Sequence, residues 1–425
     1  MRMSSAYIDL IRDRPDFRRL FIAELISLGG DWFASVALIG LTLELTGSDF
    51  YSAVILAANF LPHFLFSPVA GVLADRIDRK KIMVAADLAR CVLALGMLFV
   101  QSPSTVWIGI ASLASIATCG SFFTPASQAA LPNLVSKDQL GPANVLLSSA
   151  WGVMLAVGAG LGGLVAMQFG RDTAFIVNSI SFACSAFFVV RTRGSFSISK
   201  PAEAPHPIRD FMEGLRYARG HKMVLALLGA KAGFGLGTGV VALLPVFATR
   251  IFHAGDLGIG LMFAGRGLGA LFGPFGARIF VGESTTRLFL AIGGAMALYG
   301  VSYLVFPSMP AIWLAAAMVL IAHLGGGSQW VMSTYGLQQI VPDHVRGRIF
   351  AFDFGIVTLT MSASFLTAGW LAESLGPKPV MVALATFEIV YAAIWTLATR
   401  RFWGMKGKGE VPALHAIGEA AIPGD

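Results

Sequence analysis

Twelve apolar segments, each long enough to cross a lipid bilayer as a helix, account for most of this sequence. A crossing helix needs about 20 largely apolar residues, and a helix satisfies all its backbone polar groups internally. Only 13% of the 425 residues are charged, against about 25% in a typical soluble domain. The sequence therefore predicts an all-α polytopic membrane protein, with spans at 18–44, 51–74, 82–101, 105–130, 145–168, 173–192, 224–248, 257–280, 286–306, 311–335, 349–373 and 379–400.

Lysine and arginine are distributed unevenly between the two sets of loops. The even number of spans places both termini on one side, and the loops on that side hold most of the basic residues. The opposite loops hold only Arg171, Arg250 and Lys378. Basic loops remain in the cytoplasm, so we expect a multi-pass protein of a bacterial-type cytoplasmic membrane with both termini cytoplasmic. The net charge of +7 is then a topology signal and does not indicate nucleic-acid binding.

A polar stretch at 193–222 separates six spans from six. We expect an N-terminal bundle at 1–192, a cytoplasmic central loop at 193–222, a C-terminal bundle at 223–402 and a cytoplasmic tail at 403–425. The halves are weakly similar, since FSPVAGVLADRIDRKKIMVA aligns with FGPFGARIFVGESTTRLFLA, and SQAALPNLV with LQQIVPDHV. Two similar six-helix bundles are typical of transporters that bind substrate between the halves, near the middle of the bilayer.

The loop GVLADRIDRKK, between spans two and three, resembles the loop signature of the major facilitator superfamily, although Asp78 stands where glycine is usual. The segments SLGGDWF, FFTPASQAALPNLV and QQIVPDHVRGRIFAF resemble the branch that contains macrolide-efflux proteins and the enterobactin exporter. The resemblance implies the major facilitator fold, with two pseudo-symmetric six-helix bundles. It also implies alternating access, in which the bundles rock about a central site.

The same resemblance assigns a gating role to the loop. Its candidate residues are Gly71, Asp75, Arg76, Arg79 and Lys80. In the family the glycine allows close helix approach, the aspartate caps the start of helix eleven and the arginine joins an ion-pair network. A carboxylate at a helix N-terminus contributes about 0.3–1 kcal/mol. The alternative for Arg76 is a solvated charge, and the basic residues also serve as a topology anchor.

Four further residues are expected to support this latch. Asp87 and Arg90 lie three residues apart on one face of span three, a spacing that favours a local ion pair. Arg346 precedes span eleven, within the segment expected to meet the loop, and Asp353 lies near the start of that span.

Ionisable residues within the spans are costly and are usually functional. Asp31 lies about 14 residues into span one, roughly 20 Å along the helix, so we expect it to bind a proton reversibly. The alternative is a hydrogen bond to a neighbouring helix without a coupling role. Glu24 and Lys231 lie at equivalent depths, so they either pair across the halves or extend to the interface. Arg266 either pairs with Asp31 or binds an anionic substrate group, and Glu388 of span twelve is assigned no role beyond staying protonated.

Polar and aromatic residues recur on the spans that line the cavity in this family. Apolar walls with a few polar groups suit amphipathic ligands, although many of the 32 phenylalanines must face lipid or other helices. The candidate cavity residues are Trp32, Asn59, Phe122, Phe123, Gln128, Phe234, Thr238, Gln329, Trp330 and Tyr335.

These features predict a secondary active transporter that exports amphipathic small molecules, drug-like, macrolide-like or siderophore, by proton antiport. Alternatives are a facilitator or importer, a lipid transporter, and a membrane sensor that no longer transports. We find no HExxH, GxSxG or GxxxxGK[ST] motif, so we expect no enzyme activity and no ATP-driven pumping by this chain. We expect no cofactor or metal, a proton gradient as the energy source, and a monomer in the bilayer.

Overall fold

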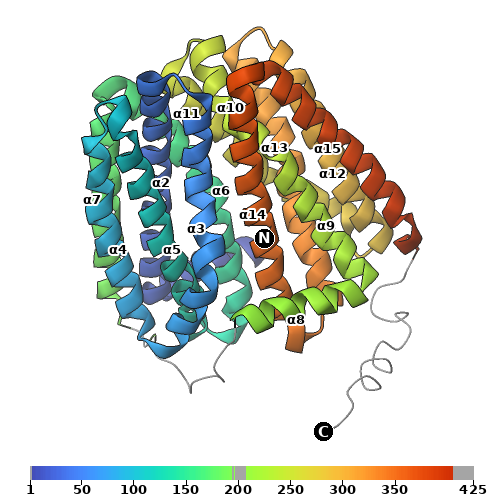
Figure 1. Ribbon diagram of the computed structural model, residues 1–425. Helices are drawn as coiled ribbons and strands as arrows, with labels where there is room; N and C mark the ends of the chain where they lie inside the picture. The colour runs from blue at the N-terminus through green and yellow to red at the C-terminus, as the bar shows by residue number, and fades with distance from the viewer. Residues whose placement is uncertain (1, 194–195, 197–206, 405–425) are drawn as a thin grey trace.

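The computed structural model describes residues 2–193, 196 and 207–404, and within these residues the secondary structure is helical (Figure 1). Twelve helical segments are long and apolar enough to cross a membrane, which confirms the predicted fold class. The first half contains α1 (Arg2–Asp13), α2 (Pro15–Thr46), α3 (Asp49–Arg76), α4 (Arg79–Leu95), α5 (Val106–Leu134), α6 (Leu140–Phe169) and α7 (Arg171–Arg191). The remainder contains α8 (Pro207–Gly220), α9 (Lys222–Gly237), α10 (Val240–Val246), α11 (Gly255–Val281), α12 (Thr285–Val305), α13 (Ile312–Ile340), α14 (Asp343–Leu375) and α15 (Pro377–Thr399).

Local sequence explains where the long helices begin and end. Pro15 occupies the first turn of α2, and Gly47 ends that helix in the left-handed region at φ 63°. Ser48 then caps α3 by accepting a hydrogen bond from the backbone N–H of Tyr51 at 3.3 Å. Proline near a helix start and glycine just after its end are the preferred residues at these positions.

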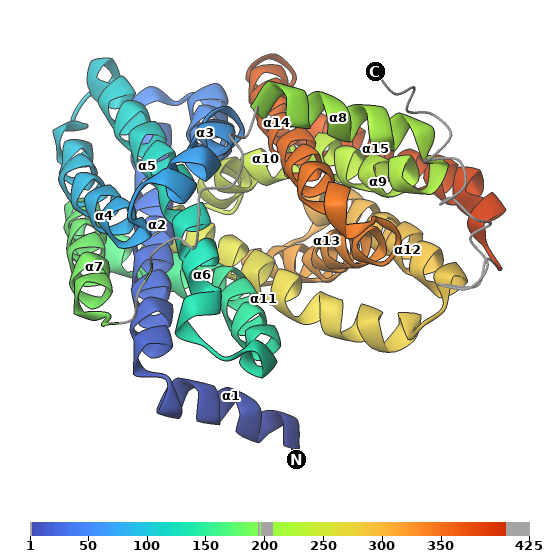
Figure 2. The same ribbon diagram turned by 90° about the horizontal axis from the view of Figure 1, so that it is seen from below.

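The spans form two groups that lie side by side, α2–α7 in one and α9–α15 in the other (Figure 1). We call these groups the N half and the C half. We call the end of the bundle near α8 the terminal face, because it also holds the start of α2 and the end of α15. The opposite end, with the turns at residues 47–48 and 252–254, is the distal face. Figure 2 views the terminal face, where α8 lies across α9 and α14.

Two helix pairs, α6 with α11 and α3 with α14, form most of the interface between the halves. Glycines allow α6 and α11 to approach backbone to backbone. A Cβ atom on Gly163 would collide with the backbone of Asp256 and Gly260, and one on Gly267 with the backbone of Ala156. Small residues at such crossings let membrane helices approach closely. The halves therefore pack most tightly along α6 and α11.

Candidate functional site

A buried charge cluster lies inside the N half, around Arg90 of α4. Arg90 bonds Asp87 at 2.5 Å, which confirms the ion pair that the spacing predicts. Arg90 also donates to Ser27 of α2 at 3.2 Å, while Asp87 accepts from Ser185 of α7 at 2.6 Å. The pair is almost fully buried and connects three helices of one half.

Glu24 and Asp31 lie on the same helix, α2, beside this cluster. Glu24 accepts a hydrogen bond from Ser127 of α5. Asp31 lies midway along α2, and its Oδ1 atom has no hydrogen-bond partner among the described residues. Arg90 and Asp87 are both close enough to act electrostatically on these two carboxyl groups, with opposite signs. The carboxyl group of Glu24 is therefore hydrogen-bonded, whereas that of Asp31 has one oxygen available to a proton or a substrate.

A second buried ion pair lies inside the C half. Lys231 of α9 bonds Asp353 of α14, donates to Thr334 of α13 at 2.8 Å and lies 4.8 Å from the Trp330 ring centroid. Glu24 and Lys231 therefore do not pair in this conformation, because each side chain is directed into its own half. The depths of Glu24 and Lys231 along their helices would allow them to pair, but the rotation of each helix directs the two side chains away from each other.

Breaking this second pair should destabilise the protein. Removing one partner of a buried ion pair costs about 3–5 kcal/mol, because the other charge is left buried and unpaired. We expect Lys231→Met to lower the melting temperature in detergent, and Lys231→Met with Asp353→Leu to recover most of the loss. Lys222→Met is a matched control on the same helix, because Lys222 is exposed. A double variant no more stable than the single one would contradict this account.

Arg266 of α11 lies where the two halves meet near the middle of the spans. Its guanidinium is 5.9 Å from the ring centroid of Trp32, 5.7 Å from that of Trp151 and 5.8 Å from that of Phe263. Trp32 and Trp151 belong to the N half. The Nε and Nη1 atoms of Arg266 have no hydrogen-bond partner among the described residues. Arg266 is therefore held by aromatic rings rather than by Asp31 in this conformation.

The predicted gating residues lie at the terminal face of the N half. Arg79 donates to the carbonyl of Ala129 at 2.7 Å, Lys80 donates to that of Thr192 at 2.8 Å, and Arg76 is exposed. These contacts connect the loop to α5 and to the end of α7. The surroundings of Gly71 and the side chain of Asp75 lie outside the described part of the chain, so the gating roles of both residues stay predictions.

The predicted latch partners lie on two helices, α4 and α14. Asp87 and Arg90 are directed into the N half and Asp353 pairs with Lys231. Arg346 donates to the carbonyl of Val341, just before its own helix, at 3.0 Å. The ion pairs of Asp87 and Asp353 therefore lie inside separate halves, and the latch between Arg346 and the loop stays a prediction.

The ten predicted cavity residues divide among several environments. Phe123 lies under Arg90, while Phe234 packs against Tyr299 and Trp330. Gln329 donates to the carbonyl of Ala230 at 2.7 Å, and Thr238 donates to that of Phe234. The others are Tyr335 beside Arg278, Trp32 beside Arg266, exposed Gln128, and partly buried Asn59 and Phe122. Of the ten, Phe234 and Trp330 are in ring contact, and a cavity shared by all ten stays a prediction.

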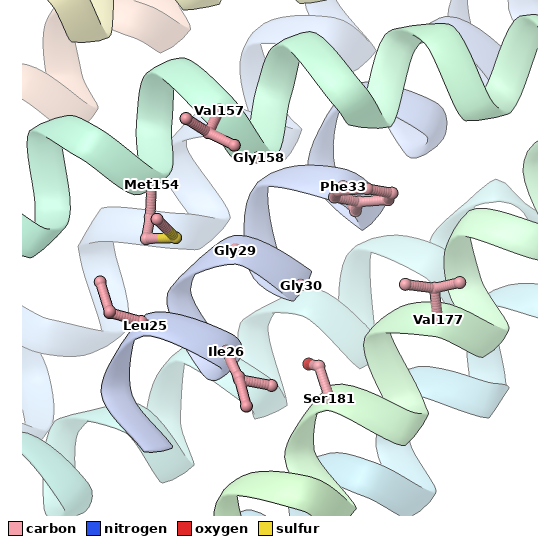
Figure 3. A pocket seen from close by; sticks show the side chains of 10 residues that line it. All are labelled: Leu25, Ile26, Gly29, Gly30, Phe33, Met154, Val157, Gly158, Val177 and Ser181. Carbon is pink, nitrogen blue, oxygen red and sulfur yellow. The ribbon is translucent and has the colours of Figure 1, made fainter. Parts of the chain in front are cut away.

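An apolar groove of about 290 Å³ lies between α2, α6 and α7 (Figure 3). Gly29 and Gly30 contribute no side chains on the α2 side of the groove, and Met154, Val157 and Val177 also line it. None of the predicted cavity residues and no charged residue lines the groove. In addition, no group of three or more His, Cys, Asp or Glu in the described part of the chain has the arrangement of a metal site.

Charged residues at the distal face connect the two halves, a role that the sequence did not predict. Arg171 of α7 bonds Asp256 of α11 at 2.9 Å and Glu44 of α2 at 2.6 Å. Arg250, after α10, bonds Asp49 of α3 at 2.7 Å. We call these two groups of ion pairs the distal lock. Only three Lys or Arg residues lie in the distal loops, and two of them belong to the distal lock. Their scarcity there is the feature of the sequence that could have predicted a role for them.

A third contact joins the halves at the same face. Glu373, at the end of α14, accepts hydrogen bonds from the side chain of Ser48 and from the backbone N–H of Phe50 at 3.0 Å. The conformation is therefore closed at the distal face.

Comparison with known sequences places this arrangement in a family. Residues 10–406 match the family described as transmembrane secretion effector. The chain belongs to this family. It is therefore a membrane transporter of the major facilitator type, as the loop signature predicted.

Several relatives of this transmembrane secretion effector are known by name. BacE of Bacillus subtilis (strain 168), which its name assigns provisionally to bacilysin export, is 25% identical over 82% of this chain and 86% of its own length. Macrolide efflux protein A of Streptococcus pyogenes is 25% identical, covering 89% and 94%. Multidrug efflux pump Tap of Mycolicibacterium fortuitum is 25% identical, covering 86% and 91%.

Solved structures agree on the fold of the secretion effector. A bacterial homologue of the human lysosomal transporter Spinster, inward-facing and unoccupied, superposes with a TM-score of 0.72 at 14% identity, covering 92% of this chain and 98% of its own. A POT family transporter in complex with a thioalcohol-conjugated peptide gives a TM-score of 0.76 at 12% identity, covering 91% and 96%. At these identities the likeness shows the fold alone.

Proposed function

We propose that this secretion effector exports amphipathic small molecules by proton antiport. The family match and relatives named for macrolide, multidrug and bacilysin export support export. The observation that carries proton coupling is Asp31, a carboxyl group midway along α2 with one oxygen unpartnered among the described residues. Ionisable groups at this depth commonly serve proton relays.

The proposed substrate site lies around Arg266, Trp32 and Trp151, where both halves contribute side chains at mid-depth. Aromatic surfaces bind the apolar body of a ligand, and a few polar groups fix its orientation. The guanidinium offers two unpartnered N–H groups to an acidic or carbonyl group of the ligand. A transporter that rocks about this point would expose the same side chains to each face in turn.

We also propose that the terminal face is cytoplasmic, because the basic loops lie there. The distal face would then open to the outside of the cytoplasmic membrane. In that orientation the closed distal face corresponds to a conformation that receives substrate from the cell. Labelling of exposed Arg→Cys variants on intact cells tests this orientation, with Arg76→Cys expected to be protected.

The decisive experiment is efflux of a panel of fluorescent amphipathic dyes from cells that express the protein. We expect energy-dependent efflux that a protonophore abolishes, and at least a tenfold loss of efflux in Asp31→Asn with normal membrane insertion. Asp172→Asn is the matched control, because Asp172 is exposed at the distal end of α7. If the dyes leave the cell at the same rate without a proton gradient, the result would contradict proton antiport and indicate facilitated transport.

A further inference from the structure

Span seven is broken in the middle of the C half. Its first part, α9, ends at Gly237 and its second part, α10, begins at Val240. Ser364 of α14 bridges the break, because its hydroxyl accepts from the backbone N–H of Gly239 at 2.9 Å and donates to the carbonyl of Leu236. Irregular backbone at membrane depth persists where protein buries it or where it lines a cavity.

Span twelve, α15, lies against α9 and binds its backbone by side-chain donors. Trp395 donates to the carbonyl of Ala226 at 2.8 Å, and Tyr391 donates to the carbonyl of Gly229 at 2.6 Å. The Tyr391 ring occupies the space that a side chain at Gly233 would fill. Side chains of α15 therefore contact α9 at successive positions along its length, from Ala226 toward the break after Gly237.

Glu388 is the next polar residue along α15 in this direction. It lies three residues before Tyr391, on the same face of α15, and its carboxyl group rests against Gly237 at the end of α9. Tyr391 and Trp395 are donors to backbone carbonyls, and a carboxyl group can act as a donor only when it is protonated. Glu388 itself contacts Gly237 without a hydrogen bond to any described residue, so its burial, and not a bond of this kind, favours the neutral acid.

The surroundings of Glu388 supply no counter-ion. The residue is fully buried, and both carboxyl oxygens lack a hydrogen-bond partner among the described residues. Tyr299 of α12 is near enough to Glu388 to interact with it electrostatically, and Thr238 and Tyr303 lie beside its hydroxyl. A buried carboxylate without a partner carries a large desolvation penalty, so the group is neutralised instead.

The buried titratable groups on the helices packed around Glu388 have other neighbours. Lys231 of α9 pairs with Asp353 of α14, Tyr391 of α15 donates to α9, and Tyr303 of α12 packs against the rings of Tyr299 and His323. The α10 segment VVALLPV has no titratable side chain. Protonation is therefore the means by which this position becomes neutral.

We infer that Glu388 is a second proton-binding site, located in the C half and loaded while the distal face is closed. Release transfers the proton to water and leaves a carboxylate, which requires the break in span seven to rearrange and admit water. Rebinding of a proton restores the neutral acid before the break closes again. Loading of Glu388 stands independently of the proposed function, whereas a role for its proton in export rests on it.

Infrared spectroscopy of the purified protein in lipid nanodiscs tests the loading directly. We expect the wild-type protein at neutral pH to show a carbonyl-stretch band of a protonated carboxyl group that is absent from Glu388→Gln. Glu283→Gln is the matched control, because Glu283 is exposed in the loop after α11, and it should retain the band. An identical band in wild type and Glu388→Gln would overturn the proposal.

A second variant at this position keeps the proposal testable if Glu388→Gln does not fold. Glu388→Met has a similar length and no ionisable group, so it should fold and melt close to the wild type if Glu388 is neutral. A melting temperature as low as that of Lys231→Met would show that Glu388 is charged and paired, and would overturn the proposal.

A transport measurement then separates this proposal from the proposed function. If Glu388 cycles its proton, Glu388→Gln should weaken the pH dependence of dye efflux several-fold while dye binding is retained. If Asp31→Asn leaves efflux unaltered, proton antiport through Asp31 fails while the infrared result still decides the loading of Glu388. Full pH dependence in Glu388→Gln would overturn the coupling role.

Discussion

Arg171→Gln is expected to open the distal face of this transporter and to abolish most of its efflux activity. In the closed conformation Arg171 of the N half bonds both Asp256 of the C half, at 2.9 Å, and Glu44 of its own half, at 2.6 Å. Without the guanidinium, Asp256 and Glu44 face each other without a cation. Hydrogen bonds to charged groups contribute about 1.5–3 kcal/mol each, which corresponds to roughly a ten- to hundredfold shift between two conformations.

Distances between spin labels on the two halves measure this shift. Labels at Ser104→Cys and Ser308→Cys occupy exposed distal turns of the N half and the C half, in a background that lacks the three native cysteines. The distance between them should increase in Arg171→Gln. Lys378→Gln is the matched control, because it removes the same charge from an exposed site on the same face. Identical distances in wild type and Arg171→Gln would refute the lock.

A double-mutant cycle identifies the partner. Asp256→Asn alone should open the distal face as well, and adding it to Arg171→Gln should cause little further change, because the pair is already broken. Residues in one ion-pair network are non-additive, whereas distant sites add. Additive effects would mean that Arg171 acts through Glu44 and not across the halves.

The sequence predicted the spans and the depths of the charged residues well, for a physical reason. The length and apolarity of a segment determine whether it crosses a bilayer, and each residue adds a fixed rise along the helix. Asp31 accordingly lies midway along α2, close to its predicted depth.

Pairing between spans could not be read in the same way. Lys231 has the depth to meet Glu24, yet it bonds Asp353 because the rotation of α9 directs it into the C half. Likewise, Arg266 has the depth to meet Asp31 but lies among aromatic rings. Helix rotation is set by packing along whole interfaces, such as α6 with α11, and no single segment encodes it.

Gly260→Val is expected to give the second large effect, by a steric route to the same open state. A Cβ atom on Gly260 of α11 would collide with the carbonyl oxygen of Ala159 and the backbone of Gly163 on α6. Backbone atoms cannot rotate aside, so the helices must separate. Overpacking of this kind costs about 1–3 kcal/mol, and we expect the distal label distance to increase and efflux to fall at least fivefold.

Gly276→Val is the matched control on the same helix, because no atom lies within 4 Å of a Cβ atom placed there. It should leave both the label distance and efflux unaltered, and equal effects of the two substitutions would contradict the account of the interface.

Ionic strength separates the steric route from the electrostatic one. Salt screens partly exposed ion pairs, so high salt should lengthen the distal distance in the wild type, where the distal lock is intact. In Gly260→Val the collision is already present at low salt, and added salt should lengthen the distance much less. In Arg171→Gln the response to salt should likewise be small, because the main pair is gone. A wild-type protein insensitive to salt, with Gly260→Val open, would assign closure of the distal face to helix packing rather than to charge.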